Sequence, residues 1–210
     1  MSGAHEGSDG TAGASGSRPA SAPPRQVLLF AGHMVDAPGR APPRFPSTKV
    51  DAAGERIGAA LDACAAGPRD LAFTQGAAGG DLLFVEACQQ RRVPVRLLLP
   101  LGRDEFMARS LLPSQDGPAW QRRFLAALER LDVPPAEAPA VLGPAGEGVD
   151  VFVRGNEWLL DSALAFGAER LHCICLWDGG GSDGPGGTRH LVESVRRRGG
   201  RVTWIDTRSL

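Results

Sequence analysis

Short apolar runs alternate with amphipathic stretches along most of the chain. The run 27–31 is continuous and apolar, which is typical of a strand buried on both faces of a sheet, and the mostly apolar segments 71–74, 95–99 and 171–177 also indicate strands. Between them, apolar residues recur at every third or fourth position, as they do on the buried face of a helix. Strands that alternate with helices build βαβ units. The pattern therefore predicts an α/β fold: a Rossmann-like, mainly parallel sheet flanked by helices in a single domain.

The remaining elements follow from the same periodicity and from capping residues. Ser47 offers a cap for the first helix, whose apolar stripe includes Ile57 and Leu61. The last strand is expected over 202–205, and a short strand is expected near Val141. Further helices are expected over 81–92, 104–110, 120–131, 156–166 (capped by Asn156 or Asp150) and 188–198.

The beginning of the chain has a different composition from the rest. Residues 1–24 are dominated by Gly, Ser, Ala and Pro and contain no aliphatic run. Such a stretch cannot bury enough apolar surface to offset the entropy of ordering it. We therefore expect residues 1–24 to form a disordered leader and residues 25–210 to form the folded domain.

Composition and charge narrow the class of protein. Hydrophobic residues make up 42% of the chain and the net charge is -1, so the sequence has no general nucleic-acid footprint. No apolar run approaches the roughly 20 residues of a membrane span, and the N-terminus lacks a signal-peptide core, so we expect a cytoplasmic protein without a membrane partner. The four cysteines lie in apolar segments and form no Cys-x-x-Cys pair. Reduced core cysteines are therefore expected, with no metal site and no cofactor.

The loops that follow the strands hold most of the glycines, and in sheets of this kind ligands bind beyond the carboxyl ends of the strands. The turn Gly76–Asp81 has the sequence Gly-Ala-Ala-Gly-Gly-Asp. Because glycine has no Cβ, the N–H groups of Gly76, Gly79 and Gly80 can approach a phosphate at the positive end of the next helix. A plain strand-to-helix turn with Asp81 as its N-cap explains the pattern about equally well. Asp81 would repel a phosphate, so a cap or a ribose contact is the better role for it.

A second glycine-rich turn, Gly184–Thr188, follows the strand over 171–177 and opens a helix. We expect Gly186, Gly187 and Thr188 to face the first turn across a ligand. A plain surface loop, with Thr188 as a cap, is the alternative. Two such turns on one sheet edge favour ligand binding over two unrelated loops.

Other polar residues lie in the same set of loops. Gly32 and His33 follow the first strand, and Arg40 and Arg44 lie in a proline-rich loop after them, where they could close over a ligand. A loop histidine bonded to nearby backbone and two solvated arginines are the alternatives. Asn156 and Asp178 are expected to hold a sugar or a base, or else to cap a helix or a turn.

The segments Thr74–Phe84 and Gly184–Thr188 together resemble the two glycine-rich turns of the SLOG superfamily, which includes the LOG phosphoribohydrolases and the DNA-processing protein DprA. The likeness covers roughly residues 26–206, but its specific parts are these two turns. Gly32–Met34 and Leu176–Gly179 are also similar to motifs of SLOG-type domains. The resemblance implies a Rossmann-like domain that takes a nucleotide or a nucleotide derivative.

The resemblance also bears on catalysis. LOG enzymes split a nucleoside monophosphate, and they carry a catalytic glutamate three residues after the threonine of the second turn. Here that position is Leu191 and the nearest acid is Glu193. We therefore expect binding or sensing of a nucleotide or nucleotide-derived ligand. An N-glycoside hydrolase or nucleoside transferase, with Glu193, Glu157 or Asp81 as its carboxylate, is the first alternative.

A non-enzymatic protein-interaction module is the second alternative. A separately encoded effector and a homo-oligomer are conceivable partners on any of these hypotheses.

Overall fold

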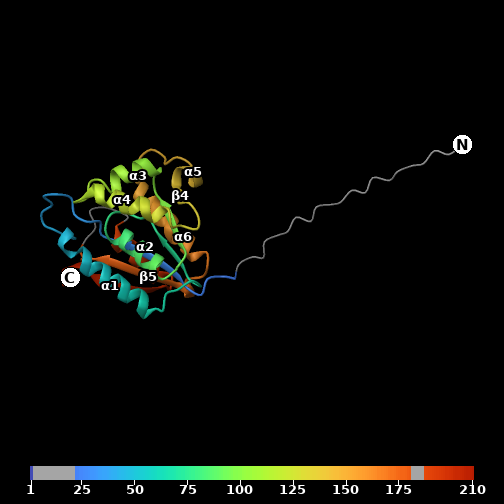
Figure 1. The fold of residues 1–210 in the computed structure, drawn as a ribbon, viewed down its shortest axis with the longest axis horizontal. Helices are drawn as coiled ribbons and strands as arrows, with labels where there is room; N and C mark the ends of the chain where they lie inside the picture. The colour runs from blue at the N-terminus through green and yellow to red at the C-terminus, as the bar shows by residue number, and fades with distance from the viewer. Residues whose placement is uncertain (2–21, 181–186) are drawn as a thin grey trace.

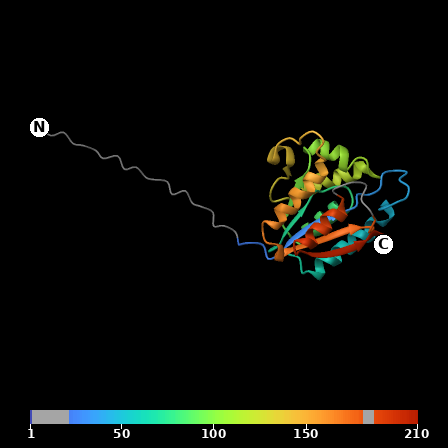
Figure 2. The ribbon, with the colours of Figure 1, turned by 180° about the vertical axis from the view of Figure 1, so that it is seen from behind.

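The computed structural model describes residue 1, residues 22–180 and residues 187–210. Six parallel strands form one sheet in the order β4-β3-β2-β1-β5-β6, and helices cover both of its faces (Figures 1 and 2). The predicted Rossmann-like α/β fold is confirmed. The strands are β1 (Val27–Gly32), β2 (Leu71–Thr74), β3 (Val95–Leu99), β4 (Ala136–Glu137), β5 (Leu171–Trp177) and β6 (Arg201–Asp206).

The helices of the described residues vary widely in length. Short 3-10 turns at Ser47–Lys49, Ala168–Arg170 and Thr207–Ser209 complete the regular structure. The α-helices are α1 (Val50–Ala63), α2 (Gly80–Gln90), α3 (Arg103–Ser110), α4 (Gly117–Leu128), α5 (Ala138–Leu142), α6 (Val151–Leu164) and α7 (Thr188–Arg197).

The inner strands of the sheet are buried on both faces, and this explains their mostly apolar sequences. Successive side chains of a strand point to opposite faces. Leu28 and Phe30 of β1 therefore belong to the core beneath α1 and α2, and the ring of Phe30 stacks on that of Phe84 at 4.8 Å. Val27 and Leu29 belong to the second core, beneath α6 and α7.

The chain changes direction around β1, which lies inside the sheet. It adds β2, β3 and β4 on one side of β1, and then returns to place β5 and β6 on the other side. Strands β1 and β5 pair from Val27↔Leu171 to Gly32↔Leu176. Because the chain leaves these two neighbouring strands in different directions, their carboxyl ends form the topological switch point at which doubly wound sheets bind ligands.

Two predicted elements are corrected by the structure. The expected strand near Val141 is wrong, because Val141 lies in α5 and the strand is the two-residue β4, which pairs with the end of β3. Helix α6 begins at Val151 rather than at Asn156, because the side chain of Asp150 accepts hydrogen bonds from the Phe152 and Val153 N–H groups and caps the helix there. Asn156 therefore lies inside α6.

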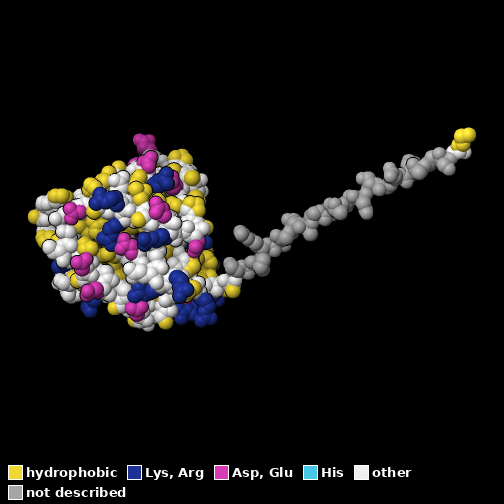
Figure 3. Space-filling model, in the orientation of Figure 1, with side chains coloured by type: hydrophobic (Ala, Val, Ile, Leu, Met, Phe, Trp, Pro, Cys, Tyr) yellow, Lys and Arg dark blue, Asp and Glu magenta, His cyan; other side chains and the backbone are white. Residues whose placement is uncertain are grey.

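The described residues give further context for the sequence predictions. Their helices are all too short or too polar to span a bilayer, and they contain no cluster of three metal-ligating side chains. The four cysteines are free thiols, and Cys88, Cys173 and Cys175 are buried. Acidic and basic side chains are interspersed over the face shown in Figure 3. Most of the predicted leader, residues 2–21, lies outside the described residues.

Candidate ligand-binding cleft

A cleft of about 160 Å³ opens at the carboxyl ends of β1 and β2, beside the start of α7. It brings the first glycine-rich turn and the end of the second one together, as the sequence predicts. Ala77 and Asp81 come from the first, which Gln75 directly precedes, and Gly187 and Thr188 come from the second. The other lining residues are Phe30, Ala31, Gly32, Met34, Ser110, Phe152, Asn156 and Leu159.

The glycines of the first turn allow the backbone to pack tightly against the loop after β1. Gly76 has φ +89° and Gly79 has φ +106°, both in the left-handed region that favours glycine. A Cβ on Gly79 would lie 2.8 Å from the Val35 nitrogen. The Val35 N–H donates to Ala78 O at 3.0 Å, and Met34 and Gly79 form an antiparallel bridge. The turn therefore needs glycine for this contact, whatever it binds.

Asp81 holds the same turn through its side chain. Its Oδ2 accepts hydrogen bonds from the Gly76 N–H at 3.1 Å and the Ala77 N–H at 3.3 Å. The N-cap residue of α2 is Gly79, so the expectation that Asp81 occupies that position is wrong, although Asp81 does bond the backbone just before the helix. The Gly80 N–H donates to His33 O at 3.2 Å. The predicted phosphate donors Gly76 and Gly80 are thus already engaged within the protein, because their N–H groups brace the turn.

The carboxyl group of Asp81 has an unusual environment. The residue is 8% exposed, and burial raises its pKa to about 6, against the lowering effect of hydrogen bonds from the Ala77 and Gly76 N–H groups. A buried carboxyl of this kind disfavours a second negative charge beside it. At 4 Å and an effective dielectric constant of 20, the repulsion between two unit charges is about 4 kcal/mol.

Asn156 reaches the cleft from α6. Its Oδ1 accepts a hydrogen bond from Gln75 Nε2 at 2.7 Å, which joins the helix to the end of β2. The close approach depends on Gly155, where a Cβ would lie 2.6 Å from the Pro100 Cβ. The predicted site residue Asn156 is therefore at the cleft, with a structural bond to its neighbour.

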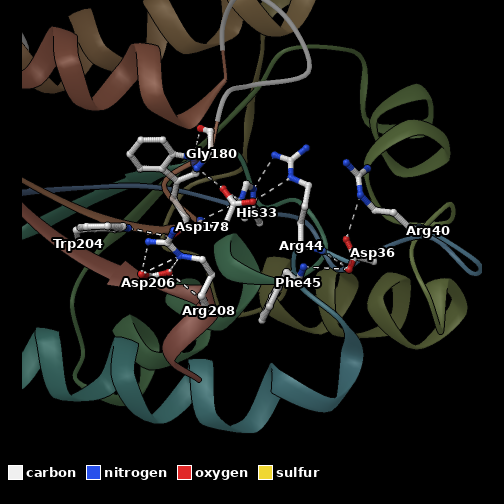
Figure 4. A network of polar contacts seen from close by, with 11 residues as sticks. His33, Asp36, Arg40, Arg44, Phe45, Asp178, Gly180, Trp204, Asp206 and Arg208 are labelled. Atoms are coloured by element: carbon white, nitrogen blue, oxygen red, sulfur yellow. Dashed lines mark hydrogen bonds and ion pairs between the residues drawn. The ribbon is translucent and has the colours of Figure 1, made fainter. Parts of the chain in front are cut away.

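The polar residues predicted after β1 and β5 form a network beside the cleft rather than in its wall (Figure 4). His33 Nδ1 lies 3.1 Å from Arg44 Nη2, and His33 Nε2 lies 3.2 Å from Asp178 Oδ1. Since a guanidinium group can only donate, Nδ1 accepts from Arg44, while Nε2 also lies 3.2 Å from the Asp178 backbone nitrogen, whose N–H points toward the ring. Burial and the charge of Arg44 lower the pKa of His33, although Asp178 raises it. His33 is therefore a neutral residue that links the ends of β1 and β5.

Asp36 shapes the loop in which the two predicted arginines lie. Its Oδ2 accepts hydrogen bonds from the Arg44 N–H at 2.9 Å and the Phe45 N–H at 3.0 Å. Its Oδ1 lies 3.5 Å from Arg40 Nε. Arg40 and Arg44 are therefore held by acids at the margin of the cleft (Figure 4), and neither is among its lining residues.

The second turn is only partly described. Gly187 is the N-cap residue of α7 and Thr188 is its first residue, and both line the cleft. Thr188 is therefore not the cap that was expected as one alternative. The prediction for Gly186 falls on a residue outside the described part of the chain.

The three carboxylates considered for catalysis lie in different places. Glu157 is exposed on α6, and the side chain of Glu193 is 53% exposed and paired with Arg189 at 3.0 Å. Neither residue lines the cleft, whereas Asp81 does. Asp81 is therefore the one candidate of the three that the structure brings to the predicted site.

Several lining residues had no sequence prediction. Ser110, at the end of α3, is buried, and its carbonyl group accepts the Ala78 N–H at 2.9 Å. Phe152 lies one helical turn before Asn156 and faces the same cleft. Gln75 directly follows β2, so the rule of carboxyl-end loops was sufficient to find it, whereas Ser110 comes from tertiary packing alone.

Comparison with protein-family models finds no match for this chain, and a search among curated proteins finds none either.

Proposed function

We propose that this protein binds or senses a nucleotide or nucleotide-derived ligand in the cleft beside the switch point, in the manner of SLOG-type domains. The observation that carries the proposal is the meeting of the two glycine-rich turns. Gln75, Ala77 and Asp81 line the same cleft as Gly187 and Thr188, although the two segments are more than a hundred residues apart in the chain. The position is also the usual one for ligands of doubly wound sheets.

The size of the cleft limits how much of such a ligand it holds. Its volume of about 160 Å³ is below the roughly 300–1,000 Å³ of sites for drug-sized ligands. It is close to the roughly 150 Å³ of an engineered cavity that holds benzene. On this proposal one ring of the ligand enters the cleft, and the rest lies outside it.

A thermal-shift screen of the full chain tests the proposal. The four ribonucleosides, their 5′-mono- and triphosphates and cyclic mononucleotides are added at millimolar concentration. A ligand present at about 100 times its Kd stabilises the folded state by about 2.7 kcal/mol, which raises the melting temperature measurably. Absence of a shift with every compound would contradict the proposal and favour the interaction module.

A variant that fills the cleft gives the screen its control. Ala77 lines the cleft, so Ala77→Leu should abolish the shift because the added side chain occupies the ligand's space. Ala59, which is exposed on α1, provides the matched variant Ala59→Leu, which should retain the shift. An undiminished shift in Ala77→Leu would place the ligand elsewhere.

N-glycoside hydrolysis is the second candidate, and the environment of Asp81 favours it. A buried carboxyl with a pKa of about 6 in the cleft is suited to proton transfer or to stabilising an oxocarbenium-like centre. Chromatography of each stabilising nucleotide after incubation separates the two functions. Recovery of the intact nucleotide supports a sensor, and release of free base or ribose phosphate that is lost in Asp81→Asn supports the enzyme.

A further inference from the structure

We infer that the cleft receives an uncharged ring of its ligand, a nucleobase or a ribose that donates a hydrogen bond to Asp81, and that it does not receive a phosphate. This inference rests on the proposed function and goes further by assigning which part of a nucleotide enters. It reverses the role that the sequence pattern suggested for the first turn.

The charge of the cleft is the first reason. Among its described lining residues, Asp81 is the one ionisable side chain, and arginine, lysine and histidine are absent from that set. Phosphate sites in proteins rely on such cations or on unengaged backbone N–H groups. The basic side chains of the neighbouring network, Arg40 and Arg44, pair with Asp36 and Asp178. Arg109, whose guanidinium lies 5.0 Å from the centre of the Phe152 ring, pairs with Glu105.

The backbone of the first turn is the second reason. An anion at the start of α2 would need the N–H groups that point toward it. The Gly76 and Ala77 N–H groups donate to Asp81 Oδ2, the Ala78 N–H donates to Ser110 O, and the Gly80 N–H donates to His33 O. The Asp81 carboxyl therefore already accepts the Gly76 and Ala77 N–H groups that a phosphate at this turn would use.

The remaining chemistry of the wall fits a ring. The Gly76 and Ala77 N–H groups both bond Asp81 Oδ2, and the Thr74 hydroxyl and the Gln75 N–H also stabilise the carboxylate. A carboxylate has about four acceptor sites, so Oδ1 has capacity for an O–H or N–H group of a ligand in addition to these donors. Met34, Phe152 and Leu159 give the cleft apolar surface for the faces of a ring. Apolar walls with a few placed polar groups are the usual composition of sites for small organic ligands.

Isothermal titration of the full chain with parts of a nucleotide tests the inference. The probes are the four nucleosides, their 5′-monophosphates, the free bases, ribose, ribose 5-phosphate and inorganic phosphate. At least one nucleoside should bind within tenfold of its monophosphate, while inorganic phosphate should give no heat of binding. Competition of the bound nucleoside by the free base or by ribose then shows which ring enters.

The opposite pattern overturns the inference. If ribose 5-phosphate or inorganic phosphate binds as well as a nucleotide while nucleosides do not bind, the cleft is a phosphate site and the proposed function stands. If no nucleoside and no nucleotide binds, the proposed function fails together with the inference.

Asp81→Asn should change the affinity for the ligand in opposite directions, depending on whether a ring or a phosphate occupies the cleft. The carbonyl group of the introduced asparagine can still accept the two backbone bonds, but its amide NH₂ group replaces Oδ1 and cannot accept from the ligand. Nucleoside affinity should therefore fall at least tenfold. If a phosphate occupied the cleft, removal of the negative charge would instead tighten the binding of the monophosphate. Asp62→Asn, at an exposed aspartate of α1, is the matched control and should leave both affinities unchanged.

Discussion

Replacing Asp81 by asparagine should stabilise the protein relative to the unsubstituted chain, and this difference in the free energy of unfolding should grow as the pH rises. Burial raises the pKa of Asp81 from 3.8 to about 6 in the folded protein, and the unfolded chain keeps the ordinary value. At about 1.4 kcal/mol for each pKa unit, this rise means that ionisation of Asp81 lowers the free energy of unfolding by about 3 kcal/mol.

The direction follows from which state binds the proton. Well below pH 4 both states are protonated, and the carboxyl group carries no penalty. Between about pH 4 and pH 6 the unfolded chain releases its proton first, so the free energy of unfolding falls as the pH rises. Above about pH 6 the folded protein also releases this proton, and the free energy of unfolding no longer changes through Asp81. Asparagine does not titrate, so the stability of Asp81→Asn relative to the unsubstituted protein should grow by about 2.5 kcal/mol between pH 4 and pH 7.

Urea unfolding followed by tryptophan fluorescence measures this difference at half-unit steps of pH. Comparison of two variants at each pH cancels the titration of other groups, His33 included, because both proteins share them. A difference that stays constant within about 0.5 kcal/mol from pH 4 to pH 7, or one that shrinks, would refute the assignment of a buried, weakly acidic Asp81.

Three other substitutions test separate parts of the structure. Asp70→Asn should lower the free energy of unfolding at neutral pH, and this loss should disappear as the pH falls through the folded-state pKa of Asp70. Burial raises the pKa of Asp70, but hydrogen bonds from an arginine and a glutamine outweigh burial and lower it. A loss of stability that is independent of pH would contradict this prediction. Gly79→Ala should cost at least about 1 kcal/mol in urea unfolding because of its φ of +106° and its 2.8 Å clash. Gly54→Ala, inside α1 where a Cβ would make only an ordinary contact, should stabilise by about 0.5–1 kcal/mol, and equal effects would argue against the turn geometry. NMR titration should give His33 a pKa below 6.5, and this pKa should rise in Arg44→Gln because the arginine charge adds to burial in lowering it. A lower His33 pKa in that variant would contradict the contact between Arg44 and His33.

The strands were predictable because burial on both faces leaves a strong local signal. The bounds of β2, β3 and β5 agree with the apolar runs of the sequence. The two-residue β4 leaves almost no signal, since its pairing with β3 depends on where the chain returns after α4. The start of α6 was missed because a capping aspartate and an asparagine six residues later both fit the pattern, and only Asp150 has its side chain bonded to the first turn.

The candidate cleft was predictable in place but not in chemistry. The loops after β1, β2 and β5 meet as expected, since parallel strands end at one edge. A glycine, however, signals only that the backbone must turn or approach something closely. At Gly79 the approaching group is the Val35 backbone, and at Gly76 the N–H partner is Asp81. The same glycine pattern is therefore compatible with a phosphate-binding turn and with a turn braced by the protein itself, and contacts from distant segments decide which of the two forms.

The reversal of the chain around β1 has a consequence for how the protein reaches its folded form. His33 and Asp178, which join the ends of β1 and β5, are 145 residues apart in the chain. The first four strands can pair before β5 arrives, but the cleft lacks the part of its wall formed by Gly187 and Thr188 until α7 docks after β5. Contacts that span so much sequence form late and slowly in folding. A ligand in the cleft would contact both the loops of β1 and β2 and the start of α7, so binding would also stabilise the pairing of β1 with β5 against local unfolding.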